Sequence, residues 1–425
     1  MQSLDEWLEY QQRQHPRAIA LGLDRIGAVA RWLDLARPAP VVISVAGTNG
    51  KGSTIAFLEA ILRAAGLRVG AYTSPHLLRY NERLRIDGAD IDDAALVEAF
   101  ARIEAARGDT PLTYFEYGTL AALRICAASS LDVALLEVGL GGRLDAVNLV
   151  DADAAIVTTV DLDHLDWLGN DRATIAREKA GIFRAGRPAV VAEADPPPSL
   201  RDAARRIGAQ EVVRGSDYGF DAAAAGWHWW HRDGTRLALP DPVLPAPSQR
   251  ANAAAAIAAL HALRGALAVG PDAIARGVSG ARAAGRLQRL AVAPATWVDV
   301  GHNPQAAREL AAWLRGQSGD GSTRAVFAAL GDKDIAGIVE PLRDQVAAWH
   351  LAPLDRVSPR GLATPALRQR MGLPATAGIH EHESVSAALA AATTAAAPRD
   401  RVLAFGSFHT AAAALEWGRE TSTAG

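Results

Sequence analysis

A strand, a glycine-rich loop and a helix in direct succession constrain the fold of this chain most. The β-branched run Val41–Ala46 leads into a loop with three glycines, and residues 53–65 carry apolar side chains at helical spacing. A buried strand, a tight loop and an amphipathic helix in this order are typical of α/β domains with a mainly parallel sheet. We therefore expect such a domain in the N-terminal part of the chain.

The alternation of strands and helices continues along the sequence. The 425 residues, 49% of them hydrophobic, exceed what one core usually organises. We predict an α/β domain over residues 1–284 with strands at 68–72, 132–138, 154–160 and 188–192. A smaller Rossmann-like α/β domain should occupy residues 285–425, with strands at 296–300, 324–329, 346–351 and 401–405. The Trp-rich segment 227–239 flanks Asp233-Gly234, which predicts a β-hairpin decorating the first domain.

The glycine-rich loop has the composition of a phosphate-binding loop. It reads Gly47-Thr48-Asn49-Gly50-Lys51-Gly52-Ser53. Glycines let backbone N–H groups converge on phosphate oxygens, the Lys51 ammonium neutralises terminal phosphates, and the Ser53 hydroxyl can reach Mg²⁺. The loop is a variant, since Val45 and Gly52 stand where the general pattern has glycine and a hydroxyl residue. A ligand-free glycine turn would not require the lysine and hydroxyls, so we predict an ATP site in a P-loop-containing domain.

Composition excludes several other classes of protein. The formal charge is −3 without a basic block, so nucleic acid is not an expected partner. Cys126 is the single cysteine, which rules out an internal disulfide and a cysteine-type metal site. The N-terminal residues lack a signal-peptide pattern and no apolar run approaches the length of a membrane span. We expect a cytoplasmic protein without membrane contact.

The loop and several later strings together resemble one family. The loop is similar to the GTNGKGS/T motif of folylpolyglutamate and dihydrofolate synthases, members of the Mur ligase superfamily. Further matching strings occur in family order along nearly the whole chain: TSPHL at 73–77, EVGLGGRLDAVN at 137–148, REKAGIF at 177–183, GRLQ at 285–288 and DVGHNP at 299–304. Gly301 and Gln305 depart mildly from the pattern. The resemblance implies a Mur ligase-like central domain and C-terminal domain, and ATP-dependent ligation of an amino acid.

The resemblance also implies a magnesium site. It assigns two Mg²⁺ ions to Ser53, Ser74, Glu137, His164 and Lys179, the last carbamylated by CO₂. Taken alone, Glu137 ends a buried strand, where a carboxylate points into the ligand crevice of an α/β sheet. Without the family match, Ser74 would be a Ser-Pro turn, His164 a capping or packing residue, and Lys179 part of a surface ion pair with Glu178 or another carboxylate.

The second domain is expected to complete the site. In the resembling family, the arginine matching Arg286 reaches the transferring phosphate, which makes it a catalytic residue together with Lys51, His164 and Lys179. The resemblance places further ligand contacts at Asn252, Asp299 and His302 for ATP, and at Ser407 and His409 for glutamate. Each of these would singly be read as a surface polar residue, and only their joint order favours a site.

Two strings indicate the acid that is ligated. LTYFEYGTL at 112–120 and RLDAVN at 143–148 resemble the bifunctional bacterial enzymes, which make dihydrofolate and then extend it. This implies 7,8-dihydropteroate, reduced folates, L-glutamate and ATP as partners, with the pterin near Thr113, Phe115 and Asp145. Phe115 can stack on a flat ring and Asp145 can accept ring N–H groups, although core packing also explains Phe115. The family expectation is a monomer.

Three alternatives stay open at this point. They are a monofunctional folylpolyglutamate synthase, a P-loop small-molecule kinase and a non-catalytic nucleotide switch. A kinase would not need a second domain carrying Arg286 and Asp299, and a switch would not need Glu137 and His164. ADP and phosphate release that requires both the pterin acid and glutamate distinguishes the ligase from all of these but the first.

Overall fold

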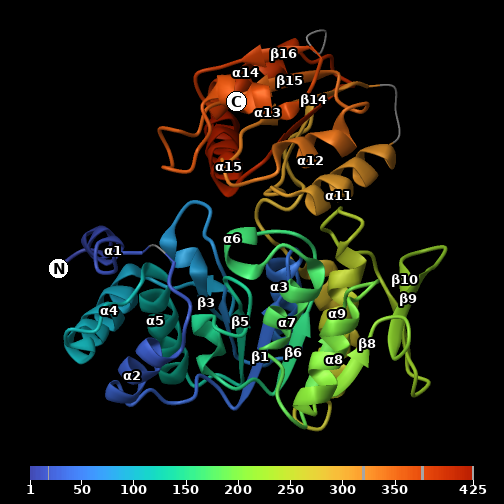
Figure 1. Ribbon diagram of the computed structural model, residues 1–425. Coiled ribbons are helices and arrows are strands. Elements are labelled where there is room, and N and C mark those ends of the chain that lie inside the picture. The colour runs from blue at the N-terminus through green and yellow to red at the C-terminus, as the bar shows by residue number, and fades with distance from the viewer. Residues whose placement is uncertain (18, 318–320, 375–377, 424–425) are drawn as a thin grey trace. The chain divides into compact units, whose positions relative to one another are not determined.

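The computed structural model describes residues 1–17, 19–317, 321–374 and 378–423 (Figure 1). Two compact units make up the chain. Unit 1 comprises Met1–Val243 and Arg250–Arg282, and unit 2 comprises Leu244–Gln249 and Ala283–Gly425. Assignment of the functional domains to residues 1–284 and 285–425 stays a prediction.

Unit 1 is built on an eight-stranded sheet in the order β4-β3-β2-β5-β1-β6-β7-β8. The neighbouring strands β2, β5, β1, β6, β7 and β8 pair in parallel. The short strands β3 and β4 are added antiparallel beside β2. The strands are β1 Val41–Ala46, β2 Val69–Tyr72, β3 Leu84–Ile86, β4 Ala89–Asp90, β5 Val133–Glu137, β6 Ala154–Val157, β7 Pro188–Val191 and β8 Gln210–Val213. The predicted mainly parallel sheet is therefore confirmed, with β1 in its interior.

Helices cover this sheet and form two buried clusters. One cluster joins sheet residues such as Leu136 to Ile175 and Leu200, and the other joins Trp7, Phe100 and Tyr117. The helices are α1 Leu4–Gln12, α2 Asp24–Trp32, α3 Lys51–Ala64, α4 Asp93–Arg107, α5 Tyr114–Ala128, α6 Leu165–Leu168, α7 Arg172–Ala180, α8 Pro198–Ile207, α9 Gln249–Ala262 and α10 Pro271–Gly280, with 3₁₀ turns η1 Tyr80–Arg83 and η2 Ala146–Leu149.

A separate three-stranded sheet decorates unit 1, in the order β11-β10-β9. Its antiparallel strands are β9 Tyr218–Ala222, β10 Trp227–His231 and β11 Arg236–Leu239. The predicted hairpin at 227–239 is confirmed as β10–β11, whereas β9 was not predicted. Trp229 is fully buried and donates from Nε1 to the carbonyl of Ala254 at 3.2 Å, which attaches the sheet to α9.

Unit 2 holds a six-stranded sheet in the order β12-β13-β17-β14-β15-β16. Pairing of β12 with β13 is antiparallel and the other pairs are parallel. The elements are β12 Gln288–Ala291, β13 Ala295–Val298, α11 Pro304–Arg315, β14 Thr323–Phe327, α12 Ile335–Val339, η3 Glu340–Leu342, β15 Ala348–Leu351, α13 Thr364–Met371, β16 Ile379–Glu381, α14 Val385–Ala395, β17 Arg401–Phe405 and α15 Phe408–Thr423. The predicted smaller doubly wound domain is confirmed.

Among the residues that the structure describes, no helix combines the length and apolar character needed to cross a bilayer.

Three histidines gather at the edge of the unit 2 sheet, and they predict acid sensitivity. The buried His350 ring stacks on His380, and its Nδ1 lies 3.0 Å from His382 Nε2. Burial and these neighbours lower the pKa of His350 to about 4, against about 6.5 in an unfolded chain. The unfolded state therefore binds more protons between these values. Unit 2 should lose up to about 3 kcal/mol of stability as the pH falls from about 6.5 to about 4.

Hydrogen exchange of the β15 amides across this pH range measures the effect. His350→Gln should flatten the pH dependence, whereas His228→Gln in unit 1 should leave it unchanged. An unaltered pH profile in His350→Gln would contradict the assignment.

Candidate active site

The phosphate loop sits where parallel strands of unit 1 end. Neighbouring strands β2, β5, β1 and β6 run in one direction, so the loops that follow them meet at one edge of the sheet. Gly47 has φ +154°, and a Cβ there would collide with Thr158 Oγ1. Gly50 has φ +87°, and its Cβ would lie 2.6 Å from Asn252 Oδ1. Asn252, which was predicted as an ATP contact, thus lies beside the loop.

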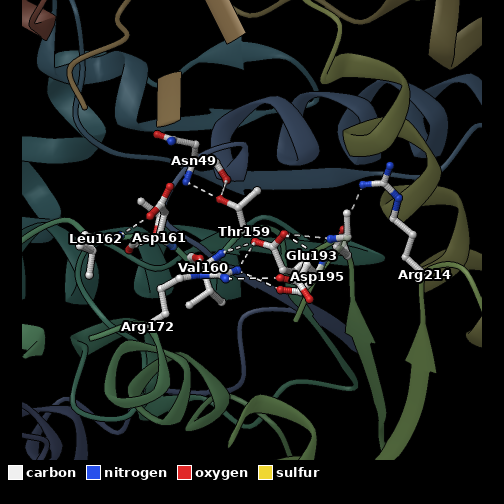
Figure 2. A network of polar contacts seen from close by, with 12 residues as sticks. Asn49, Thr159, Val160, Asp161, Leu162, Arg172, Glu193, Asp195 and Arg214 are labelled. Carbon is white, nitrogen blue, oxygen red and sulfur yellow. Dashed lines mark hydrogen bonds and ion pairs between the residues drawn. The ribbon is translucent and has the colours of Figure 1, made fainter. Parts of the chain in front are cut away.

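The segment after β6 holds the phosphate loop in place. Thr48 N–H donates to the Thr159 carbonyl at 2.8 Å, and Asn49 N–H donates to Thr159 Oγ1 at 2.9 Å. Thr158 Oγ1 donates to the Asn49 carbonyl at 2.6 Å, and Thr48 Oγ1 donates to the Asp161 carbonyl at 3.0 Å. Figure 2 shows the Asn49–Thr159 contact among its neighbours. The loop is therefore shaped by protein contacts, and sequence reasoning missed Thr158 and Thr159 as its supports.

That supporting segment is itself held by the residues that follow β7 and by the first residue of α7. Val160 N–H donates to Glu193 Oε2 at 2.8 Å, and Arg172 Nε donates to the Val160 carbonyl at 2.8 Å (Figure 2). Arg172 also donates to the Asp195 carbonyl at 2.9 Å. These bonds fix the turn between β6 and α6, which carries His164.

The lysine of the loop is folded back onto the loop. Lys51 Nζ donates to the carbonyls of Gly47 at 3.0 Å and Thr48 at 3.3 Å. Lys51 is one of three lysines among the 44 Lys and Arg residues, the others being Lys179 and Lys333. A compact ammonium on a flexible stem can exchange such carbonyl contacts for phosphate oxygens.

Oxygen donors gather at the same sheet edge. Glu137 ends β5 with a buried side chain, and its Oε2 accepts from Ser74 N–H at 3.1 Å. Ser53 is buried in the first turn of α3. His164 has φ +51°, and its Nε2 lies 4.0 Å from Asp163 Oδ1. Hydroxyl and carboxylate oxygens suit Mg²⁺, so this donor set fits a hard divalent cation. Asp163, the residue directly before His164, was not predicted as part of the site.

Lys179 is buried on α7, and α7 is attached to the loop after β5. The pKa of Lys179 is lowered to about 7 by burial and by the charge of Lys51. Arg143 N–H donates to the Glu178 carbonyl at 2.8 Å, and Arg143 Nη2 pairs with Glu178 Oε1 at 2.9 Å. A Cβ at Gly142 would lie 2.8 Å from the Glu178 carbonyl oxygen. Glu178 thus pairs with Arg143, which argues against a surface ion pair between Lys179 and Glu178.

Two of the three predicted pterin residues also support the local backbone. Thr113 caps α5, since its side chain accepts from Glu116 N–H at 3.2 Å. Asp145 is buried and accepts from Leu140 N–H at 2.8 Å and Val147 N–H at 3.0 Å. Burial raises the pKa of Asp145 to about 6.

Phe115 lies against the loop after β5, which carries Gly139, Gly141 and Gly142. A Cβ at Gly139 would lie 2.6 Å from Phe115 Cζ, and the Phe115 ring centroid is 6.2 Å from that of Tyr72. The side chain is only partly buried. Phe115 therefore packs on its neighbours while keeping part of its ring accessible.

Predicted residues of unit 2 meet around Phe408. Arg286 lies over the Phe408 ring at 5.5 Å, and the His302 and Phe408 centroids are 5.8 Å apart. Buried Asp299 accepts from Leu287 N–H at 2.8 Å and Gly301 N–H at 2.7 Å. Burial raises the pKa of Asp299, opposed by the Arg286 charge. Sequence reasoning missed Phe408, which stands between the two residues predicted for glutamate.

Those two residues differ in their surroundings. Ser407 is buried, and its Oγ accepts from Thr410 N–H at 2.9 Å near the start of α15. His409 is half-buried, and burial, followed by the charge of Arg360, lowers its pKa. Ser407 therefore caps backbone, while His409 keeps an accessible ring.

Comparisons with known proteins cover both units. The Mur ligase middle domain matches residues 45–260, and the Mur ligase glutamate ligase domain matches residues 285–408. The dihydrofolate synthase/folylpolyglutamate synthase of Escherichia coli (strain K12) is 46% identical over 97% of this chain and 95% of its own. The enzyme of that name from Haemophilus influenzae is 40% identical, over 96% of each chain.

Two solved structures are similar to this chain over nearly its full length. The structure of E. coli FolC in complex with DHPP and ADP has a TM-score of 0.93 at 44% identity, covering 99% of this chain and 98% of that one. A bifunctional folylpolyglutamate synthase/dihydrofolate synthase with Mn, AMPPNP and L-glutamate bound has a TM-score of 0.90 at 46% identity, covering 98% of each chain.

The position of Lys51 predicts a large effect on catalysis. Lys51→Ala removes an ammonium that contacts the carbonyls of Gly47 and Thr48 in the loop. ATP turnover should fall by at least about a hundredfold. Arg63→Ala, at the other end of α3, is the matched control and should retain turnover. Circular dichroism checks folding, and Lys51→Ala activity within about tenfold of wild type would exclude this loop as the catalytic ATP site.

Proposed function

Because the chain belongs to the Mur ligase family, we propose that it is an ATP-dependent ligase that adds L-glutamate to 7,8-dihydropteroate and then to reduced folates. The observation that carries this proposal is the 46% identity over 97% of the chain to a bifunctional enzyme. A folylpolyglutamate synthase from Lacticaseibacillus casei is 33% identical over only 75% of the chain. The bifunctional activity is therefore favoured over the monofunctional one.

The first half-reaction joins two anions, and unit 1 supplies the positive charge for it. A carboxylate oxygen of the substrate attacks the γ-phosphorus of ATP and forms an acyl phosphate, while the bond from the γ-phosphorus to the bridging oxygen breaks and releases ADP. Lys51 Nζ leaves the Gly47 and Thr48 carbonyls for the terminal phosphates. Ser53, Ser74, Glu137 and His164 would hold Mg²⁺, which neutralises phosphate charge when bound.

The second half-reaction forms the amide. The glutamate amine attacks the acyl carbon, and phosphate leaves from the tetrahedral intermediate together with one proton from nitrogen. Arg286 is assigned to the transferring phosphate, and Asp299 and His302 to the nucleotide. Their grouping around Phe408 within unit 2 supports one shared role.

Substrate contacts follow from the same reasoning. Phe115 is assigned to the pterin face, because its ring is partly accessible beside Gly139. Thr113 and Asp145 shape that wall, and Asp145 also offers an acceptor. Ser407 and His409 are assigned to glutamate. We also propose that the enzyme acts as a cytoplasmic monomer.

Product release tests the function. With purified chain, release of ADP and orthophosphate should require dihydropteroate and glutamate together, and mass spectrometry should show dihydrofolate and then longer polyglutamates. Release without glutamate, or a stable phosphorylated product, would indicate a kinase, and no turnover would indicate a switch. Extension of folates without use of dihydropteroate would leave the monofunctional synthase.

Lys179 is assigned as a carbamate. An ammonium this deeply buried beside a cation site is repelled both by the metal and by Lys51. Reaction of the neutral amine with CO₂ forms an N–C bond and releases one proton, which turns a cation into an anion with two oxygens. The oxygens suit Mg²⁺, and the anion balances the charge of Lys51.

Chemical rescue and labelling test this modification. Lys179→Ala should lose most ligase activity and regain part of it with formate or acetate, whereas Lys179→Arg should not recover. With ¹³C-bicarbonate, wild type should show a carbamate carbon resonance that Lys179→Ala lacks. Full activity of Lys179→Ala, or a wild-type spectrum without that resonance, would refute the carbamate.

A further inference from the structure

A cluster of two histidines and an aspartate lies outside the predicted site. His231 ends β10, Asp233 stands in the turn to β11, and His261 lies near the end of α9. Figure 1 shows β10 beside α9 within unit 1. The ligand atoms of the three side chains all lie within 4.8 Å of one another. Neither the loop chemistry nor the ligase mechanism uses them.

The two imidazoles face the two oxygens of one carboxylate. His231 Nδ1 lies 3.0 Å from Asp233 Oδ1, and His261 Nε2 lies 2.8 Å from Asp233 Oδ2. The backbone N–H of Asp233 points at the same His231 Nδ1 at 3.3 Å, and this contact requires a lone pair on that nitrogen. A lone pair facing a carboxylate oxygen is repulsive unless a proton or a metal ion lies between them. A metal ion between Nδ1 and Oδ1 removes this repulsion and takes the lone pair of Nδ1 in place of the Asp233 N–H.

The donor set and its spacing fit a borderline transition metal. Two imidazole nitrogens and one carboxylate oxygen suit Zn²⁺ and its neighbours, whereas Mg²⁺ and Ca²⁺ prefer oxygen alone. Two atoms bound about 2.0–2.2 Å from one ion lie about 2.8–3.6 Å apart at common ligand angles. The observed separations of 3.0 and 2.8 Å lie at the lower end of this range, so the side chains would move apart by a few tenths of an ångström around a tetrahedral ion.

Surrounding contacts fix the three side chains before any ion binds. The His231 ring stacks on Trp229 with an interplanar angle of 11°, and His261 lies 5.4 Å from the same indole. Asp233 Oδ1 accepts from Thr235 N–H at 3.0 Å. Ligands held by neighbours in this way lose little entropy on binding.

One side of the cluster stays open. His231 and His261 are each 15% exposed and Asp233 is 34% exposed. A shallow groove lined by Asp221, Trp230, His231, Gly234 and Arg236 borders it. Water can therefore supply the remaining ligand of a tetrahedral ion.

We propose that His231, Asp233 and His261 bind a Zn²⁺-type ion that ties the β10–β11 turn to α9. The role is structural, because the ion links two elements that are far apart in the sequence. The proposal does not depend on the ligase activity.

Cobalt titration of the full chain tests the site. Chelator-treated protein in excess Mg²⁺ is titrated with Co²⁺, and the d–d absorption of the bound ion is followed. Wild type should bind one equivalent, and Asp233→Asn and His261→Gln should each weaken binding by at least about tenfold. His228→Gln is the matched control, since His228 lies on β10 but faces the opposite side from His231.

The cluster of His350, His380 and His382 offers Co²⁺ a second set of nitrogen ligands, so its contribution to the absorption must be excluded. Each protein is therefore also prepared with His380→Gln and His382→Gln, which dismantle the group around His350. Hydrogen exchange of β10 and β11 supplies an independent readout, and Zn²⁺ should slow it in wild type but not in Asp233→Asn. Circular dichroism confirms that the variants fold.

Three results would overturn the proposal. They are Co²⁺ affinity unchanged by Asp233→Asn and His261→Gln, absorption lost only with His380 and His382, and exchange that Zn²⁺ does not alter. In the last case the cluster is a hydrogen-bonded clasp in which each imidazole donates a proton to Asp233.

Discussion

The active edge of unit 1 depends on the attachment of the phosphate loop to the end of β6. Parallel pairing sets Val45 beside Ile156 and Ala46 beside Val157, so the chain leaves both strands at the same level. Thr158 and Thr159 then bond the backbone of Asn49 and Thr48. These bonds need no nucleotide, and they leave Gly47 no room for a side chain. The loop is thus preorganised, and ATP binding spends little energy on ordering it.

A second attachment determines the setting of Lys179. Gly142 lets the loop after β5 approach the last turn of α7, and Arg143 holds Glu178 by backbone and side chain. Glu178 is thereby directed away from Lys179. Lysine accounts for only three of the 44 Lys and Arg residues in the chain. Two of the three are Lys51, in the phosphate loop, and Lys179, buried on α7. Arginine keeps its charge, so at position 179 it could not lose a proton to form the proposed carbamate.

Sequence patterns predicted the elements whose signals are local. Buried parallel strands such as β1 and β5 are continuous apolar runs, and the β10–β11 hairpin has a clear turn, so all were found. The short strand β3 and the edge strands β12 and β16 were missed, because three or four residues carry little periodicity. Contacts that join distant segments were missed as well. Nothing in the sequence around Thr48 indicates a hydrogen bond to the carbonyl of Asp161. Likewise, nothing in the sequence next to Asn303 or Ser407 indicates that Arg286 and His302 both contact the Phe408 ring.

Helix α9 connects the decorating sheet to the phosphate loop. Asn252, near its start, lies beside Gly50, whereas His261 near its end meets the β10–β11 turn. Nine residues of helix separate them by about 13 Å. Trp229 Nε1 donates to the Ala254 carbonyl between these points. The sheet therefore contacts α9 at two places, Ala254 and His261. A helix held near its end by the contact of His261 with Asp233 and nearer its start by a buried indole presents Asn252 to the loop from a fixed position. The three-stranded sheet therefore helps to position Asn252 through α9, although it contributes no residue to the predicted active site.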